Sequence, residues 1–271
     1  MRVTFVSVFN IDSGGGINSW LSEVAPRLSR RMEVSVLTSD RGNRVHPLSD
    51  MLKGVDLIEK PIMTLSPSKS GLFTTSLVRE FASSNVVYLC SNSSLFARTL
   101  CVTLQDISGT PVIASHHNET GQHDHRTNYV MLRLGGPLID RMMYAHHALN
   151  QGTVSWLKEI KAKRIYKIPN GVNTQNFLPS SKKARFTILF LGRHEYEKGI
   201  DRIPPIVNLV KHYISNFEIL VGGTGSLTNA IRQNISNSNV TWLGQLNDLS
   251  KKTSVVLAVP PNTFKSYSYG I

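Results

Sequence analysis

The opening of the chain constrains its fold most, because it alternates between two hydrophobic patterns. Residues 2–9 are rich in β-branched and aromatic side chains, as is typical of a buried strand. Residues 10–16 form a loop that ends in three consecutive glycines, and apolar side chains then follow at helical spacing from Trp20 to Leu28. Residues 32–37 resume the strand pattern. We predict a βαβ unit with a glycine-rich first turn, which favours an α/β fold.

The glycine turn Gly14-Gly15-Gly16 matches neither the G-x-G-x-x-G dinucleotide fingerprint nor the Walker pattern with its Lys. Its glycines still allow a ligand to approach the backbone closely beside a helix N-terminus. The same residues also fit a tight turn that has no ligand. The turn by itself leaves both interpretations open.

The same alternation continues along the chain. Further strands are predicted at 54–58, 86–90, 111–115, near Ala148, and at 165–168, 186–191, 217–221, 240–244 and 254–259. Further helices are predicted over 95–104, 128–144, 154–160, 200–213 and 227–235. The segment 169–185 is loop-rich and charged, which predicts a linker between domains at 1–168 and 186–271. Two Rossmann-like, doubly wound domains facing a cleft fit this pattern.

The turn after the strand at 186–191 carries the clearest chemistry. Arg193 and Lys198 lie in it, and glycine follows at Gly199 before a helix. Arg binds phosphate in bidentate fashion and Lys adds a point charge, so the pair suits a diphosphate. Cations that merely face water are the alternative interpretation. A second glycine-rich turn, Gly222-Gly223-Thr224-Gly225, follows the next strand.

The strand at 111–115 runs directly into His116 and His117. Ligands of open α/β sheets collect beyond the carboxyl ends of the strands, so this pair is well placed for function. A polar loop is the alternative. His123, Asp124 and His125 follow closely but lack a strict ligand spacing, so a metal site is disfavoured.

Composition limits the partners and the compartment. Lys and Arg number 30 against 18 for Asp and Glu, and the resulting charge of +12 suits a nucleotide, a nucleic acid or an acidic membrane surface. Cys90 and Cys101 fit neither a metal pattern nor a disulfide framework, which favours a reducing compartment. Without a signal peptide or an apolar stretch of bilayer length, a cytoplasmic protein is expected.

Taken in order, these segments resemble retaining glycosyltransferases of the two-Rossmann-domain (GT-B) type, specifically the large family 4 group. The matching segments extend across nearly the whole chain, at 14–16, 112–118, 168–173, Phe177, 190–193, 197–201, 221–225 and 240–244. The resemblance implies an enzyme that uses a nucleotide-activated sugar with retention at the anomeric carbon. It implies no metal and no other cofactor.

The resemblance also implies roles for single residues. Arg193 and Lys198 look like the pair that binds the donor diphosphate and stabilises its departing charge. His117 looks like the histidine that contacts the donor sugar near the reacting centre. The donor-binding candidates are Gly15, Gly16, Gly192, Gly223, Thr224, Gly225, Trp242, Leu243 and Tyr267.

The chain departs from the family pattern near its end. Tyr267 stands where the family has a first Glu, and the second Glu would lie beyond Ile271. The second domain is therefore expected to be incomplete, and a catalytically impaired nucleotide- or glycan-binding remnant is the alternative function. The expected partners are a nucleotide-sugar donor and a glycan, lipid-linked or small-molecule acceptor. The positive charge also suits peripheral contact with the inner membrane face. Nucleic acid is not expected, because no basic stripe appears.

Overall fold

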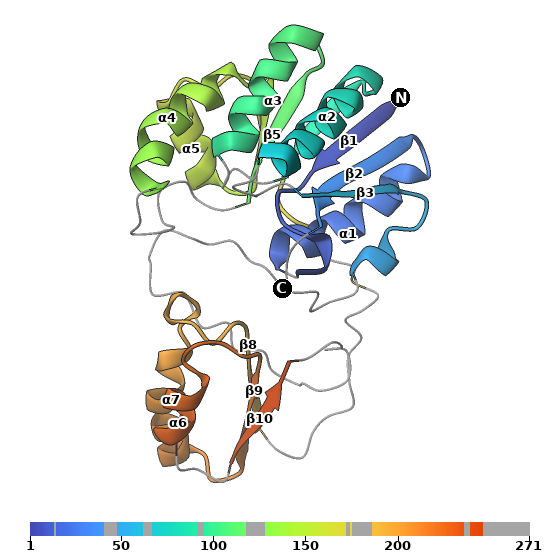
Figure 1. Ribbon diagram of the computed structural model, residues 1–271. Coiled ribbons are helices and arrows are strands. Elements are labelled where there is room, and N and C mark those ends of the chain that lie inside the picture. Colours follow the sequence, from blue (N-terminus) through green and yellow to red (C-terminus); the bar gives the residue numbers. More distant parts are fainter. Residues whose placement is uncertain are drawn as a thin grey trace. The chain divides into compact units, whose positions relative to one another are not determined.

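The chain folds into two compact units, each built on a parallel β-sheet (Figure 1). The computed structural model describes residues 1–13, 15–40, 48–61, 67–90, 95–117, 128–171, 174, 186–235 and 239–245. Met1–Asn170 forms the first unit, and the second begins at Gly171. Among the described residues, no helix combines the length and apolar character that a bilayer crossing demands. The predicted linker and the predicted strand at 254–259 fall largely or wholly outside these residues.

The first unit holds seven parallel strands in the order β3-β2-β1-β4-β5-β6-β7. The strands are β1 (Arg2–Val6), β2 (Glu33–Ser39), β3 (Asp56–Lys60), β4 (Val86–Leu89), β5 (Val112–His116), β6 (Ala145–Ala148) and β7 (Ile165–Lys167). The helices are α1 (Gly16–Ser29), α2 (Pro67–Ser83), α3 (Leu95–Ser108), α4 (Asn128–Met142) and α5 (Gln151–Glu159), with short 3₁₀ turns η1 (Ile11–Ser13) and η2 (Leu48–Met51). The direction of winding reverses between β1 and β4, which makes their carboxyl ends the switch point where such sheets bind ligands.

Alternation along the strands places helices on both faces of this sheet. Val3 and Phe5 of β1 pack with Leu21 and Ala25 of α1. Val6 points to the other face, where α2 and α3 supply the packing (Figure 1). The doubly wound architecture predicted from the sequence is confirmed.

The second unit holds three parallel strands in the order β10-β9-β8. Its elements are β8 (Phe186–Leu191), η4 (Tyr196–Lys198), η5 (Ile200–Arg202), α6 (Ile203–Tyr213), β9 (Phe217–Gly222), α7 (Thr228–Gln233) and β10 (Val240–Gly244). Its core joins β-branched and aromatic strand residues to Ile203 and Val207 of α6 and Ile231 of α7. The carboxyl end of β8 lies beside that of β9, the one strand with which β8 pairs among the described residues.

Two elements differ from the sequence prediction. Helix α2 was not predicted, because its first residues include Pro67, Gly71 and several Ser and Thr, which favour turns in isolation. Its buried residues Leu77 and Phe81 show that tertiary packing outweighs those propensities. The helix predicted over 200–213 begins instead as η5, and α6 then starts with proline in its first turn, where the missing N–H costs nothing.

Helix α5 ends in a Schellman motif that has lysine where glycine is usual. The Ala162 N–H donates to the Leu157 carbonyl at 2.9 Å and the Lys161 N–H to the Lys158 carbonyl at 2.9 Å. In this motif the first residue after the helix cap adopts the left-handed conformation. That residue is Lys161, which has φ 61°. A side chain with a Cβ is strained there.

We expect Lys161→Gly to raise the free energy of unfolding by about 1 kcal/mol, because glycine relieves the left-handed strain. Urea denaturation of the purified chain measures the change. Lys161→Ala is the matched control, since it removes the same charge and keeps the Cβ. An equal gain in both variants would assign the effect to charge and contradict the strain.

Candidate functional site

The turns that follow β8 and β9 are joined by backbone hydrogen bonds into one structure, here called the paired turns (residues 192–199 and 222–227). The Gly192 N–H donates to the Gly222 carbonyl at 3.2 Å, and the His194 N–H to the Thr224 carbonyl at 3.0 Å. In return, the Leu227 N–H donates to the His194 carbonyl at 3.0 Å. The paired turns lie at the carboxyl ends of parallel strands, where an α/β sheet binds ligands.

Glycine is required in the second of these turns because the backbones approach so closely. Gly223 has φ 112°, and a Cβ there would lie 1.9 Å from the Gly192 carbonyl oxygen. A Cβ at Gly225 would lie 2.6 Å from the His194 carbonyl oxygen. The N–H groups are also engaged, since Gly223 donates to the Gly244 carbonyl at 2.6 Å and Gly225 to Thr228 Oγ1 at 3.0 Å. These glycines therefore serve the packing of the two turns.

The first of the paired turns carries both predicted cations. Arg193 and Lys198 are exposed. The chain folds back through η4, so that Lys198 Cβ lies 4.0 Å from the Cβ position at Gly192, which directly precedes Arg193. Gly199, with φ 72°, continues this reversal. The structure thus brings the two predicted cations to the carboxyl end of β8.

This turn also contains a buried histidine, His194, which was not predicted as a site residue. His194 is fully buried, and its Nδ1 lies 2.9 Å from Thr228 Oγ1. Burial lowers the pKa of His194. Its ring meets Trp242 edge to face at 5.8 Å, and the Arg232 guanidinium lies 5.0 Å from the Trp242 ring. Trp242 thus packs against the core, and Leu243 beside it on β10 is half-buried.

In the first unit, His117 follows β5 and is 6% exposed. Its ring lies 5.0 Å from Trp20 and 6.0 Å from His147. Burial, with a smaller contribution from His147, lowers the pKa of His117 to about 4, so the ring is neutral near pH 7. Its Nε2 is buried without a hydrogen-bond partner among the described residues. A neutral imidazole with a spare nitrogen can hydrogen-bond a sugar hydroxyl.

His147 of β6, which sequence reasoning missed, is held on both sides. Its Nε2 donates to the Ile168 carbonyl at 2.7 Å, which leaves Nδ1 to accept from the Tyr88 hydroxyl. Tyr88 in turn stacks on Trp20 at 5.4 Å. No sequence signal distinguishes His147 from a core residue, because it lies within a buried strand.

The first glycine turn differs from the second. Gly15, with φ 94°, precedes α1, and among the described residues a Cβ at Gly15 or Gly16 would meet nothing within 4 Å. Within that part of the chain, the backbone at the start of α1 is open at the switch point, as anion binding at a helix N-terminus requires. Gly14, Tyr267 and the predicted metal alternative at His123, Asp124 and His125 lie outside the described residues. Within the described residues, no three His, Cys, Asp or Glu side chains are grouped as metal ligands.

Comparisons with known proteins agree with this architecture. No protein-family model matches the chain. A component of the phosphatidylinositol N-acetylglucosaminyltransferase of Arabidopsis thaliana is 27% identical over 249 residues, 83% of this chain and 52% of the relative. HepE of Anabaena, solved with UDP and glucose, superposes with a TM-score of 0.68 at 16% identity, over 91% of this chain and 70% of HepE. A glycosyltransferase of Rickettsia africae gives 0.66 at 16% identity, over 91% and 69%. The chain has the fold of the GT-B glycosyltransferases.

The predicted α/β fold class and the predicted resemblance to GT-B glycosyltransferases are thus confirmed. The chain spans about half the length of the curated relative. The second domain was predicted to be incomplete, and the described part of its sheet has three strands against seven in the first.

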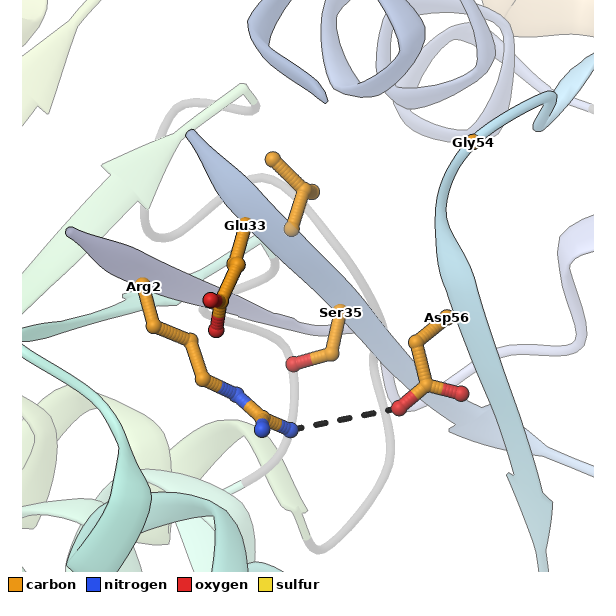
Figure 2. A pocket seen from close by; sticks show the side chains of 6 residues that line it. Arg2, Glu33, Ser35, Gly54 and Asp56 are labelled. Atoms are coloured by element: carbon orange, nitrogen blue, oxygen red, sulfur yellow. Dashed lines mark ion pairs between the residues drawn. The ribbon is translucent and has the colours of Figure 1, made fainter. Parts of the chain in front are cut away.

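A hollow at the amino ends of the strands of the first sheet is a weaker candidate for a site (Figure 2). Arg2, Glu33 and Asp56 line it at the amino ends of β1, β2 and β3. Arg2 is already paired with Glu80 at 2.7 Å and with Asp56 at 3.9 Å. The positive charge of Arg2 is therefore neutralised by protein carboxylates. The hollow also lies at the amino ends of the strands, whereas parallel sheets bind ligands at the carboxyl ends.

We expect acid to destabilise the first unit through its buried histidines. Burial lowers the pKa of His117 and of His146 to about 4, against about 6.5 in the unfolded chain. Below pH 6.5 the unfolded state thus binds more protons than the folded state. The free energy of unfolding is therefore highest above pH 6.5 and falls as the pH drops toward 4. Each of the two contributes a loss of about 1–2 kcal/mol between pH 6.5 and pH 5.

Urea denaturation at pH 7 and pH 5, followed by the fluorescence of Trp20 and Trp156 in a Trp242→Phe background, measures this loss. In His117→Gln, which cannot titrate there, the decrease should be smaller by the share of His117. An unchanged pH dependence in that variant would show that His117 is not buried in its neutral form.

We also expect Gly223→Ala to unfold the paired turns locally. The new methyl group meets the Gly192 carbonyl at a strained φ, so the backbone must move, at a cost of about 2–3 kcal/mol or more. Gly244→Ala is the matched control, because Gly244 has φ 65° but no described residue within 4 Å of its Cβ position. Hydrogen exchange of peptides from 186–235 should accelerate far more for Gly223→Ala. Equal acceleration in the two variants would contradict the close approach.

Proposed function

We propose that the chain is part of a glycosyltransferase that moves a hexose from a UDP-sugar to an acceptor. The observation that carries the proposal is the geometry of the paired turns, which present Arg193 and Lys198 together at the carboxyl end of β8. The GT-B fold supports it, as do the UDP complexes of structural neighbours such as HepE.

The departing group in such a transfer is a nucleoside diphosphate, on which negative charge develops. Arg193 binds its phosphate oxygens through the guanidinium fork, and Lys198 adds an ammonium. Fixed cations at a developing charge lower the barrier because they need no reorganisation. No metal and no other cofactor is required in this mechanism, and we propose net retention at the anomeric carbon.

In the first unit, His117 is proposed to contact the donor sugar. Its ring is neutral, and its Nε2 has no partner among the described residues. Satisfying that buried nitrogen with a sugar hydroxyl would remove an unpaired polar group. Gly15 and Gly16 would lie against donor phosphate or acceptor, because no described residue covers their Cβ positions. In the second unit, the proposed donor-binding residues are Gly192, Gly223, Thr224, Gly225, Trp242, Leu243 and Tyr267.

The acceptor proposed first is phosphatidylinositol, which the name of the Arabidopsis relative specifies together with an N-acetylglucosaminyl donor. A lipid acceptor fits the charge of +12, since anionic headgroups attract Lys and Arg by about 1 kcal/mol each. The proposed location is the cytoplasm, with peripheral contact at the inner membrane face. The proposed domains are 1–168 and 186–271 with a linker at 169–185.

Titration calorimetry with UDP tests the site directly. We expect Arg193→Ala to weaken UDP binding about 10- to 100-fold, because a charge-assisted contact is worth about 1.5–3 kcal/mol. Arg193→Lys should recover part of the loss, since it restores charge without the bidentate fork. Lys198→Ala should also weaken binding, whereas Lys211→Ala, on the last turn of α6, is the matched control and should not. Equal affinity in Arg193→Ala and the unmodified chain would refute the diphosphate role.

A transfer assay tests the activity. UDP-N-acetylglucosamine is mixed with the chain and phosphatidylinositol vesicles, with and without EDTA, and the anomeric proton coupling of the product reports retention. Salt-sensitive sedimentation with the same vesicles reports membrane contact, and fractionation of cells reports the compartment. UDP binding without transfer or donor hydrolysis would favour the alternative, a nucleotide-binding remnant. That alternative is favoured by Tyr267 at the position of the family's first Glu.

A further inference from the structure

The turn that carries Arg193 and Lys198 also contains a carboxylate, and that carboxylate has a defined partner. Glu195 Oε1 accepts from the Ser226 backbone N–H at 2.9 Å, and Glu195 Oε2 accepts from the Ser226 hydroxyl at 2.6 Å. These two hydrogen bonds, with a smaller contribution from Arg193, hold the pKa of Glu195 below its usual range. Glu195 is therefore ionised near neutral pH, and both of its oxygens are engaged by one residue of the second turn.

The backbone of Glu195 shapes the turn between the two cations. Its N–H donates to the Arg193 carbonyl at 2.9 Å, and its carbonyl accepts from the Lys198 N–H at 3.0 Å. One residue thus fixes the backbone beside each cation, and its side chain ties that backbone to Ser226. A movement of the Glu195 side chain would therefore shift the backbone at both Arg193 and Lys198.

The second turn is built to receive this carboxylate. A Cβ at Gly225 would lie 2.8 Å from Glu195 Oε1, so only glycine leaves room for the oxygen. The neighbouring Thr228 hydroxyl accepts from the Gly225 N–H and lies against His194 Nδ1. The carboxylate therefore occupies a fitted position between the turns.

The electrostatic consequence favours a positioning role. A carboxylate between two cations would repel a diphosphate if it faced the same ligand. Here its charge is directed at the N–H and O–H of Ser226. Because both carboxylate oxygens are engaged by Ser226, the carboxylate supplies the rigidity that preorganised binding needs.

We propose that Glu195 is a positioning residue, whose ionised carboxylate, held by Ser226, fixes the Arg193–Lys198 turn in the shape that binds the donor diphosphate. The inference rests on the proposed function, because it concerns the same diphosphate site. It assigns the effect to a residue that does not itself touch the ligand.

Calorimetric titration with UDP tests the proposal through single and double variants. Glu195→Ala should weaken UDP binding about tenfold, and Ser226→Ala should weaken it less, because the backbone N–H remains. Glu195→Gln should recover part of the affinity, since its amide oxygen can still accept from that N–H. Glu218→Gln, on β9, is the matched control and should bind UDP like the unmodified chain.

A double-variant cycle separates positioning from simple loss of structure. If Glu195 acts through Arg193, Glu195→Ala should have a clearly smaller effect in the Arg193→Ala background than alone. Full additivity of the two effects would overturn the proposal. Unchanged UDP affinity in Glu195→Ala would also overturn it. So would a higher UDP affinity, which is the result expected if the carboxylate instead competes with phosphate for Ser226.

The outcomes also separate this inference from the proposed function. If the unmodified chain binds UDP and Arg193→Ala binds it weakly, the proposed diphosphate role of Arg193 stands whatever Glu195→Ala does, and the transfer assay tests the proposed activity. Normal binding by Glu195→Ala then overturns only the positioning role. Failure of the unmodified chain to bind UDP overturns both.

Discussion

The close approach of two backbone segments in the second unit is the constraint on which the candidate donor site depends. The Gly192 carbonyl occupies space that any side chain at Gly223 would need, with a Cβ position only 1.9 Å away. Because that space is free, three backbone hydrogen bonds can join the turns after β8 and β9. The joined turns then give a short, exposed segment a fixed shape. This backbone contact sets the relative position of the Arg193 and Lys198 backbones.

Glycine has a different use in the two glycine-rich turns of the chain. In the second unit, Gly223 and Gly225 are surrounded by backbone and by Glu195, so their missing side chains are replaced by protein. In the first unit, no described residue lies within 4 Å of the Cβ position at Gly15 or Gly16. The first pattern stiffens a loop, whereas the second leaves a helix N-terminus uncovered by the described part of the chain, as ligand binding there requires. The two sequences look alike, and only the neighbouring elements decide between these uses.

Features that depend on local sequence could be predicted, whereas features that depend on distant neighbours could not. Strand and helix periodicity identified most elements, and the glycine turns and the two cations were recognisable from residue type and spacing. Helix α2 escaped because its buried residues Leu77 and Phe81 lie behind a start rich in turn formers. His147, His194 and the Glu195–Ser226 pair escaped for another reason. Each owes its role to a partner between 21 and 59 residues away in the chain, and such pairings follow from strand register and turn geometry, which periodicity does not encode.

The distribution of charge within the described residues follows from the same separation of roles. The histidines near the carboxyl ends of β5 and β6 are buried, and burial lowers their pKa values, so they add polarity without charge near pH 7. The cationic part of the candidate site is instead carried by exposed side chains, of which the Arg193 guanidinium is charged at every physiological pH. Binding of a diphosphate by the paired turns therefore need not vary with pH near neutrality, whereas the stability of the first unit should. We therefore expect mild acid to reduce the stability of the first unit, whereas a guanidinium in the candidate site keeps its charge.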